Sequence, residues 1–145
     1  MSAGRVLGVD YGSVRIGIAV SDPLRIIALG VGTIPNNSEA ANMVAELVQK
    51  YDAEIIVVGM PLTLKGEKGM KAEEVENFIE KVASLVTTEI VRWDERFTTR
   101  MAQRTLIDMG TTKKQRRMQK GRVDEIASAL ILQSFLDQTK HSIGC

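Results

Sequence analysis

Four carboxylates at the ends of predicted elements are the side chains of this sequence best suited to chemistry. Asp10, Asp94 and Glu95 close short apolar segments, and Asp124 opens a long amphipathic one. Carboxylates that meet in one crevice repel each other, so they stay ionised together only when a cation neutralises them. Hard divalent ions such as Mg²⁺ and Mn²⁺ take oxygen ligands of this kind. A pair of such ions ~3.5–4 Å apart supports phosphodiester hydrolysis, which is the chemistry that these acids indicate.

The rest of the composition excludes most other catalytic chemistry. The chain of 145 residues has one cysteine, Cys145, and one histidine, His141. A single thiol allows no internal disulfide and no multi-cysteine zinc site. A single histidine excludes a two-histidine acid–base pair and disfavours a Ser–His–Asp triad. Chemistry must therefore come from carboxylates, Lys and Arg, hydroxyl groups or a bound metal.

The acids have to be positioned by secondary structure, which the hydrophobic pattern predicts. Strands are expected at residues 5–10, 15–21, 26–33, 54–59 and 90–93. Helices are expected at 40–51 with Ser38 as the cap, at 70–86, at 98–109 with Thr98 or Thr99 as the cap, and at 123–138. Short connections between the first three strands predict an antiparallel meander.

This order of elements predicts a single α/β domain over residues 1–145, with 139–145 as a flexible tail. Right-handed crossovers place the fourth and fifth strands on the other side of the first. We therefore expect a mixed five-stranded sheet of order 3-2-1-4-5 with helices on both faces. The carboxyl ends of strands 1, 4 and 5 then open on one crevice, where Asp10 meets Asp94 and Glu95.

Asp124 is expected to reach the same crevice from the last helix. Ala127 and Ser128, three and four residues later, are small enough to let that helix face approach the sheet. A structural role competes with the chemical one for each acid. Asp10 is also a common turn residue, Asp124 also complements a helix dipole, and either acid at 94–95 also suits an ion pair with a neighbouring arginine.

A basic segment precedes Asp124. Residues 113–122 carry a charge of +6 and no acid, and the rest of the chain carries −5, although the total is only +1. Such a segment beside an acidic crevice suits a polyanion, whose phosphates bind Arg and Lys; a solvated loop is the competing interpretation. The expected nucleic-acid-binding residues are Arg96, Arg100, Lys113, Lys114, Arg116, Arg117, Lys120 and Arg122.

Four motifs together resemble one family of bacterial proteins. They are 7–13 (LGVDYGS), 57–62 (VVGMPL), 94–99 (DERFTT) and 120–124 (KGRVD), and the resemblance spans about residues 4–138. They are similar to the YqgF family, also called RuvX, which is associated with Holliday-junction resolution and with processing of the 5′ end of the 16S ribosomal RNA precursor. The resemblance implies a ribonuclease H-like (RNase H-like) fold and a metal-dependent site made by Asp10, Glu95 and Asp124. It favours Glu95 over Asp94 because RNase H-like resolvases present a glutamate near this strand end.

The leading hypothesis is a metal-dependent endonuclease, a hydrolase that cuts structured nucleic acid. Its substrate is the 5′ end of pre-16S rRNA in ribosome biogenesis or a Holliday junction, and its cofactor is Mg²⁺ or Mn²⁺. Asp10 would bridge the metals, while Glu95 and Asp124 would orient them and the attacking water. The sequence is compatible with an RNA or a DNA substrate, with one metal ion or two, and with a monomer or a weak dimer. It also allows Asp94 to share the role given to Glu95.

Two alternatives come from other classes of protein. A non-catalytic RNA-binding ribosome-assembly factor would use the basic segment, and its binding would not depend on metal. The segment 10–13 with Gly17 also resembles the first phosphate loop of actin-like and sugar-kinase-like ATPases, but those folds need two such halves and no second copy is visible. No apolar run approaches the ~20 residues of a membrane span and no signal peptide is visible. We therefore expect a cytoplasmic protein without a membrane partner.

Overall fold

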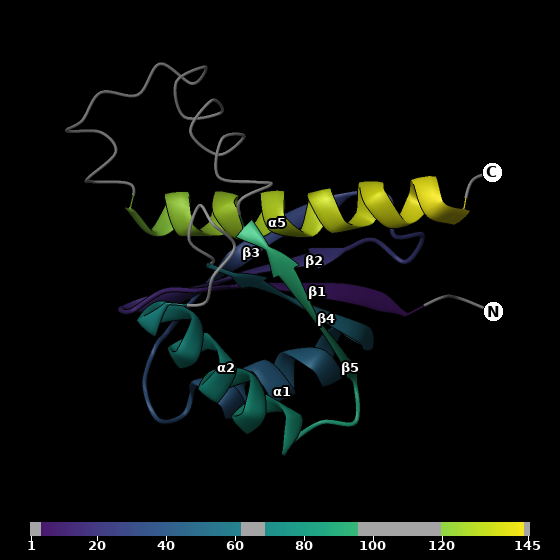
Figure 1. Ribbon diagram of the computed structural model, residues 1–145. Helices are drawn as coiled ribbons and strands as arrows, with labels where there is room; N and C mark the ends of the chain where they lie inside the picture. The colour runs from purple at the N-terminus through teal and green to yellow at the C-terminus, as the bar shows by residue number, and fades with distance from the viewer. Residues whose placement is uncertain (1–3, 62–68, 96–119, 144–145) are drawn as a thin grey trace.

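Figure 1 shows the computed structural model, which describes residues 4–61, 69–95 and 120–143. For 120–125 and 140–143 the description is limited to the backbone. The elements in chain order are β1 (Arg5–Tyr11), β2 (Arg15–Ser21), β3 (Ala28–Pro35), α1 (Ala40–Tyr51), β4 (Ala53–Met60), α2 (Met70–Ala83), β5 (Glu89–Asp94) and α5 (Lys120–Ile143). The helix expected at 98–109 lies outside the described residues.

The described strands form one sheet in the order β3-β2-β1-β4-β5, which confirms the predicted topology. β2 is antiparallel to both β1 and β3, whereas β1, β4 and β5 are parallel to one another. The carboxyl ends of β1, β4 and β5 therefore meet at one edge of the sheet. The carboxyl end of β3 lies at that same edge, because β1 and β3 both run opposite to β2.

The alternation of side chains along β1 divides the core into two layers. Leu7 and Val9 pack into the layer formed with α1 and α2, while Val6 packs into the layer formed with α5. Helices α1 and α2 thus cover one face of the sheet and α5 covers the other (Figure 1). Helices on both faces were predicted, and this prediction is confirmed. The same alternation places Asp10 on the α5 face and Tyr11 on the α1–α2 face.

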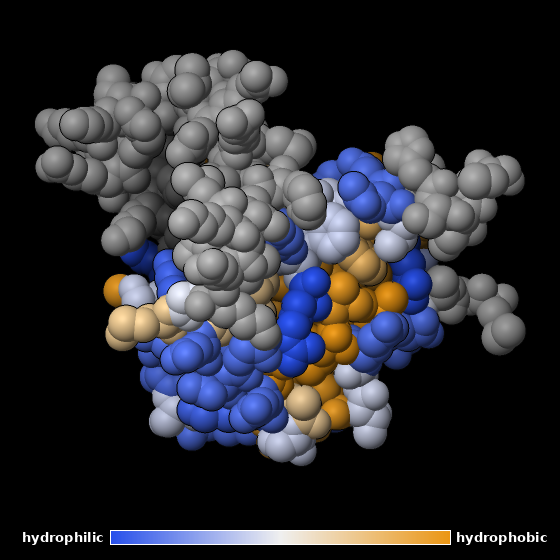
Figure 2. All heavy atoms as spheres, viewed as in Figure 1, coloured by the Kyte–Doolittle hydropathy of each residue, from blue (hydrophilic) through white to orange (hydrophobic). Residues whose placement is uncertain are grey.

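The edge strand β5 is more open to solvent than the strands at the centre of the sheet. Figure 2 shows hydrophilic residues over the outer surface of α2 and hydrophobic residues at the surface beside β5. Ile90 and Val91 of β5 are only half-buried, whereas Val57 of the neighbouring β4 is fully buried. One of the acid-bearing strand ends is therefore located at a partly open edge.

Helix α5 lies unusually close to β1 because of a glycine in the strand. A Cβ atom at Gly8 would lie 2.8 Å from the Leu132 Cβ and 3.3 Å from the Ser128 carbonyl oxygen. Ser128 itself is fully buried. The small residue on the helix and the glycine on the strand together allow this approach, and the prediction of a closely packed last helix is confirmed at Ser128.

Strand β3 begins at Ala28, two residues later than predicted. The reason is a competing turn: the Asp22 carboxylate accepts hydrogen bonds from the backbone N–H groups of Ile26 (2.7 Å) and Ile27 (2.9 Å). Arg25, within this turn, has a φ of 58°. An aspartate that binds backbone groups in this way holds apolar residues in a turn that the hydrophobic pattern alone assigns to a strand.

The helix ends also differ from the prediction. Ser38 is not the cap of α1: Glu39 occupies the N-cap position without a side-chain cap, and the Asn37 side chain accepts the Glu39 N–H at 2.9 Å. Helix α5 starts at Lys120 and continues to Ile143, beyond the predicted 123–138, so residues 139–143 extend the helix where a tail was expected. The Thr139 hydroxyl donates to the Phe135 carbonyl at 3.0 Å in this extension.

Candidate active site

Two of the predicted acids meet beside β4. Asp10 lies near the end of β1, paired with Gly17, and Glu95 follows β5 directly. Although β4 separates these two strands, the Asp10 and Glu95 side chains are joined by a hydrogen bond. Two carboxyl groups form such a bond only when they share a proton. The structure thus brings together Asp10 and Glu95, as the sequence predicts.

A glycine in β4 makes this meeting possible. A Cβ atom at Gly59 would lie 2.7 Å from the Glu95 Oε1 and 2.9 Å from the Glu95 Cγ. It would also lie 2.7 Å from the Ile131 Cδ1 of α5. Glu95 therefore passes over a position where any other residue would obstruct it. The sequence signal for this position was the motif 57–62, which places a glycine at the end of a buried strand.

The sheet register distinguishes Glu95 from Asp94. Asp94 pairs with Met60, which packs into the α1–α2 layer, and Trp93 pairs with Gly59 and packs into the α5 layer. Asp94 therefore belongs to the α1–α2 face and Glu95 reaches the α5 face, where Asp10 lies. The arginine that could have neutralised either acid, Arg92, is engaged elsewhere: its guanidinium binds Glu76 of α2 at 2.7 and 2.9 Å.

The negative charges of Asp10 and Glu95 repel each other, which makes it unfavourable to ionise both groups. Burial, the charge of Asp10 and the hydrogen bond that protonated Glu95 donates to the Asp10 carboxylate raise the pKa of Glu95 to about 8, and the charge of Asp94 adds to the increase. Lys71, in the first turn of α2, acts in the opposite direction but does not offset these effects. Without a cation, the pair therefore keeps a proton at neutral pH. A divalent cation would replace that proton, so this donor set fits a hard metal ion that prefers oxygen ligands.

The other predicted site residues fall largely outside the description. Within the described residues, no group of three or more His, Cys, Asp or Glu gathers in a way that could hold a metal ion. The Asp124 side chain lies outside the described residues. Its backbone lies one turn before Ser128, in the end of α5 that overlies the carboxyl end of β1 (Figure 1).

The side chains of the predicted basic residues also lie outside the described part of the structure. Arg96, Arg100, Lys113, Lys114, Arg116 and Arg117 are not among the described residues, and neither are the side chains of Lys120 and Arg122. The backbones of Lys120 and Arg122 form the first turn of α5. No described helix is long and apolar enough to span a membrane.

Two solved structures of proteins bound to Holliday junctions have a similar fold. A Thermus thermophilus RuvC bound to a Holliday junction superimposes with a TM-score of 0.58 and 15% sequence identity, covering 94% of this chain and 96% of that one. A fowlpox virus resolvase bound to a Holliday junction gives a TM-score of 0.57 and 12% identity, covering 93% and 98%. At these identities the likeness shows the fold, which is that of the RNase H-like resolvases.

Within that class, the chain belongs to the RuvX family, described as Holliday junction resolvases, whose sequence profile matches residues 4–138. A relative from Ruminiclostridium cellulolyticum is 39% identical over 137 residues, covering 92% of this chain and 94% of the relative. Another from Endomicrobium trichonymphae is 43% identical over 135 residues, covering 92% and 95%. Both carry the name "Putative pre-16S rRNA nuclease". The predicted family and the predicted enzyme class, a nuclease, are confirmed.

Proposed function

We propose that this protein is a metal-dependent endonuclease whose cation is held by Asp10, Glu95 and Asp124. The observation that carries the proposal is the close approach of two half-buried carboxyl groups, Asp10 and Glu95, whose mutual repulsion and partial burial raise the pKa of Glu95 to about 8. Mg²⁺ or Mn²⁺, bound as one ion or two, would supply charge neutralisation, activation of a water and stabilisation of the leaving oxygen. Asp124 would complete the ligand set from the first turns of α5.

The chain's own residues prepare this site before substrate arrives. Gly59 leaves the space through which Glu95 reaches Asp10. Asp10 and Glu95 are both half-buried, and partial removal from water strengthens the interaction of a carboxylate with a cation. Lys71 adds a positive charge next to Glu95. The basic segment 113–122 would bind the phosphates on either side of the cleaved bond.

We propose the 5′ region of pre-16S rRNA as the substrate and the cytoplasm as the location. The relatives named after this RNA are 39% and 43% identical over nearly the whole chain, whereas the junction-bound resolvases are 12–15% identical. The family description nevertheless names Holliday junctions, so a four-way DNA junction is the alternative substrate to test beside the RNA.

A cleavage panel tests the proposal. Pre-16S rRNA, single-stranded RNA and a four-way DNA junction are incubated with the wild type, Asp10→Asn or Glu46→Gln in Mg²⁺, Mn²⁺ or chelator. Glu46 is an exposed acid of α1, far along the chain from the acid pair, and serves as the matched control. We expect metal-dependent cleavage of the precursor RNA by the wild type and Glu46→Gln, and none by Asp10→Asn. Binding of RNA without cleavage under every condition would favour the non-catalytic assembly factor.

A further inference from the structure

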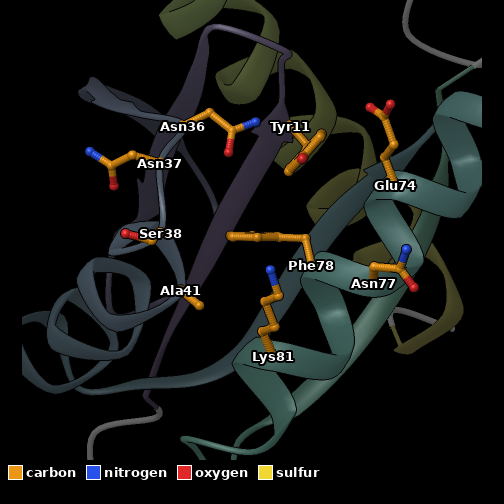
Figure 3. Close-up of a pocket in the computed structure, with 9 residues that line it drawn as sticks. All are labelled: Tyr11, Asn36, Asn37, Ser38, Ala41, Glu74, Asn77, Phe78 and Lys81. Atoms are coloured by element: carbon orange, nitrogen blue, oxygen red, sulfur yellow. The ribbon is translucent and has the colours of Figure 1, made fainter.

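A second hollow opens at the same edge of the sheet, on the face opposite the acid pair. This pocket of about 220 Å³ is enclosed by Tyr11 of β1, the 36–38 segment between β3 and α1, and the inner side of α2 (Figure 3). Tyr11 follows Asp10 directly in the chain but belongs to the α1–α2 layer. The pocket and the acid pair therefore flank the carboxyl end of β1, one on each face of the sheet.

The floor of the pocket is aromatic. The rings of Tyr11 and Phe78 are 5.2 Å apart and inclined by 49°. Phe78 is 5% exposed and extends from α2 toward β1 across the pocket, as Figure 3 shows. Half-buried Tyr11 is therefore the ring that offers a surface to a ligand, with Phe78 packed beside it. An exposed aromatic ring stacks planar, π-rich groups, and nucleobases are the planar groups that a nuclease meets.

The wall formed by 36–38 is held in place before any ligand binds. The Asn36 amide donates to the Gly12 carbonyl at 2.7 Å, which ties this segment to the end of β1. The Asn37 side chain accepts the Glu39 N–H at 2.9 Å. These bonds fix the shape of the wall, so a ligand would not have to order it.

Three polar side chains around the pocket remain available for a ligand. Within the part of the chain that the structure describes, the side chains of Ser38, Asn77 and Lys81 make no hydrogen bond or ion pair with other residues. A hydroxyl and an amide can each donate and accept hydrogen bonds, and the ammonium of Lys81 binds an anion. Glu74, which also lines the pocket, adds a negative charge there, and this charge disfavours a bare anion.

From this combination we infer that the pocket is a nucleotide subsite. It would take one unpaired nucleotide of the substrate strand, adjacent to the phosphate held at Asp10 and Glu95. The base lies on Tyr11, which Phe78 supports from the core side, with Asn77 at the edge of the base, and the phosphate lies toward Lys81. A base within a duplex could not enter, so the subsite selects an unpaired nucleotide beside the cleaved bond. The inference rests on the proposed nuclease function for the identity of the ligand.

The first test is binding of AMP to the metal-free wild-type protein, followed by NMR. We expect AMP to shift the backbone resonances of Ser38 and Asn77 with saturation. Loss of one neutral hydrogen bond weakens binding by about 5-fold, which is the effect expected for Asn77→Ala. Lys81→Ala should weaken binding by at least as much, whereas Lys50→Ala, an exposed lysine of α1 outside the pocket, should leave it unchanged. Equal shifts with inorganic phosphate, or no weakening in the two variants, would overturn the inference.

The second test connects the pocket to the substrate. In single-turnover cleavage, Asn77→Ala should raise the substrate concentration for half-maximal rate by about 5-fold while the maximal rate changes less than 2-fold. A 2-aminopurine placed next to the cleaved bond should lose fluorescence on binding to wild type and not to Tyr11→Ala. If AMP binds but the protein cleaves nothing, the proposed function fails. If cleavage occurs and Asn77→Ala cleaves as the wild type does, the subsite fails alone.

Discussion

At the scale of single residues, the account depends on one hydrogen-bonded pair of carboxyl groups. Glu95 has a pKa of about 8, against an ordinary value of 4.5, chiefly because it is buried beside Asp10. A carboxyl group with a raised pKa holds its proton in the folded state at a pH where the unfolded chain has released it. The pair therefore lowers the free energy of unfolding as pH rises from about 4.5 to about 8, when no cation is bound.

The first prediction concerns stability against pH. With a chelator present, the melting temperature of the wild type should fall relative to that of Asp10→Asn as pH rises from 5 to 8. The variant lacks the negative charge of Asp10, which repels the ionised form of Glu95. One pKa unit corresponds to ~1.4 kcal/mol, so we expect a relative change of about 1–2 kcal/mol. Thermal unfolding followed by circular dichroism measures it. A constant difference between the two proteins over this range would contradict the electrostatic account.

The second prediction concerns Gly59, which we place as a positioning residue for Glu95. Gly59→Ala puts a methyl group 2.7 Å from both the Glu95 Oε1 and the Ile131 Cδ1. We expect the affinity for Mn²⁺ to fall at least 10-fold, with destabilisation of about 1–3 kcal/mol from overpacking. Gly69→Ala is the control, since nothing lies within 4 Å of its added methyl. Unchanged Mn²⁺ affinity in a folded Gly59→Ala protein would show that Glu95 does not need this path.

At the scale of elements, the sequence predicted what hydrophobic alternation controls and missed what side-chain hydrogen bonds control. The five strands followed from short apolar segments, alternating in 15–21 and nearly continuous in 54–59, and their order followed from right-handed crossovers. The start of β3 was wrong because Asp22 holds Ile26 and Ile27 in a turn. The α1 cap was wrong because Glu39 takes the N-cap position and its N–H is bound by the Asn37 side chain. Such local bonds leave no periodic signal.

The candidate site shows the same division. Asp10 and Glu95 could be predicted because strand ends in a parallel sheet meet at one edge. The passage of Glu95 over Gly59 could not be predicted, because it depends on a contact between two strands that are distant in sequence. The nucleotide pocket could not be predicted either, because its residues come from three separate segments.

The third prediction concerns how α5 is seated. Gly8→Ala places a methyl group 2.8 Å from the Leu132 Cβ and 3.3 Å from a backbone oxygen, so the helix must move away from β1. We expect a loss of about 1–3 kcal/mol in the free energy of unfolding by urea. Cleavage should fall as well, because the first turns of α5 carry Asp124. A variant as stable and as active as the Gly69→Ala control would mean that the helix does not set the geometry of the site.

At the scale of the whole molecule, charge is separated along the chain. The segment 113–122 carries +6 and the remainder −5. A molecule with an acidic site and a separate basic segment would orient a polyanion, because the phosphates are attracted to the cationic side chains and a bound metal is needed before they can approach the carboxylates. Affinity for RNA should therefore depend steeply on salt concentration.

The fourth prediction concerns this salt dependence. Replacing Lys113, Lys114, Arg116 and Arg117 together by glutamine should reduce the slope of log affinity against log salt. Each phosphate contact on a single strand contributes ~0.7 to that slope, so we expect a reduction of up to about 3. Fluorescence anisotropy with labelled precursor RNA at four salt concentrations measures it. An unchanged slope would indicate that the segment is a solvated loop without contact to the substrate.

The central claim, that Asp10 and Glu95 together hold a divalent cation in exchange for a proton, is tested most directly by calorimetric titration of Mn²⁺ at pH 7 in two buffers of different ionisation enthalpy. The account predicts saturable binding to the wild type and to Glu46→Gln, with release of close to one proton per site. It predicts that Asp10→Asn and Glu95→Gln each lose at least 10-fold in affinity and no longer release the proton. Equal binding by all four proteins, or binding without proton release, would contradict it.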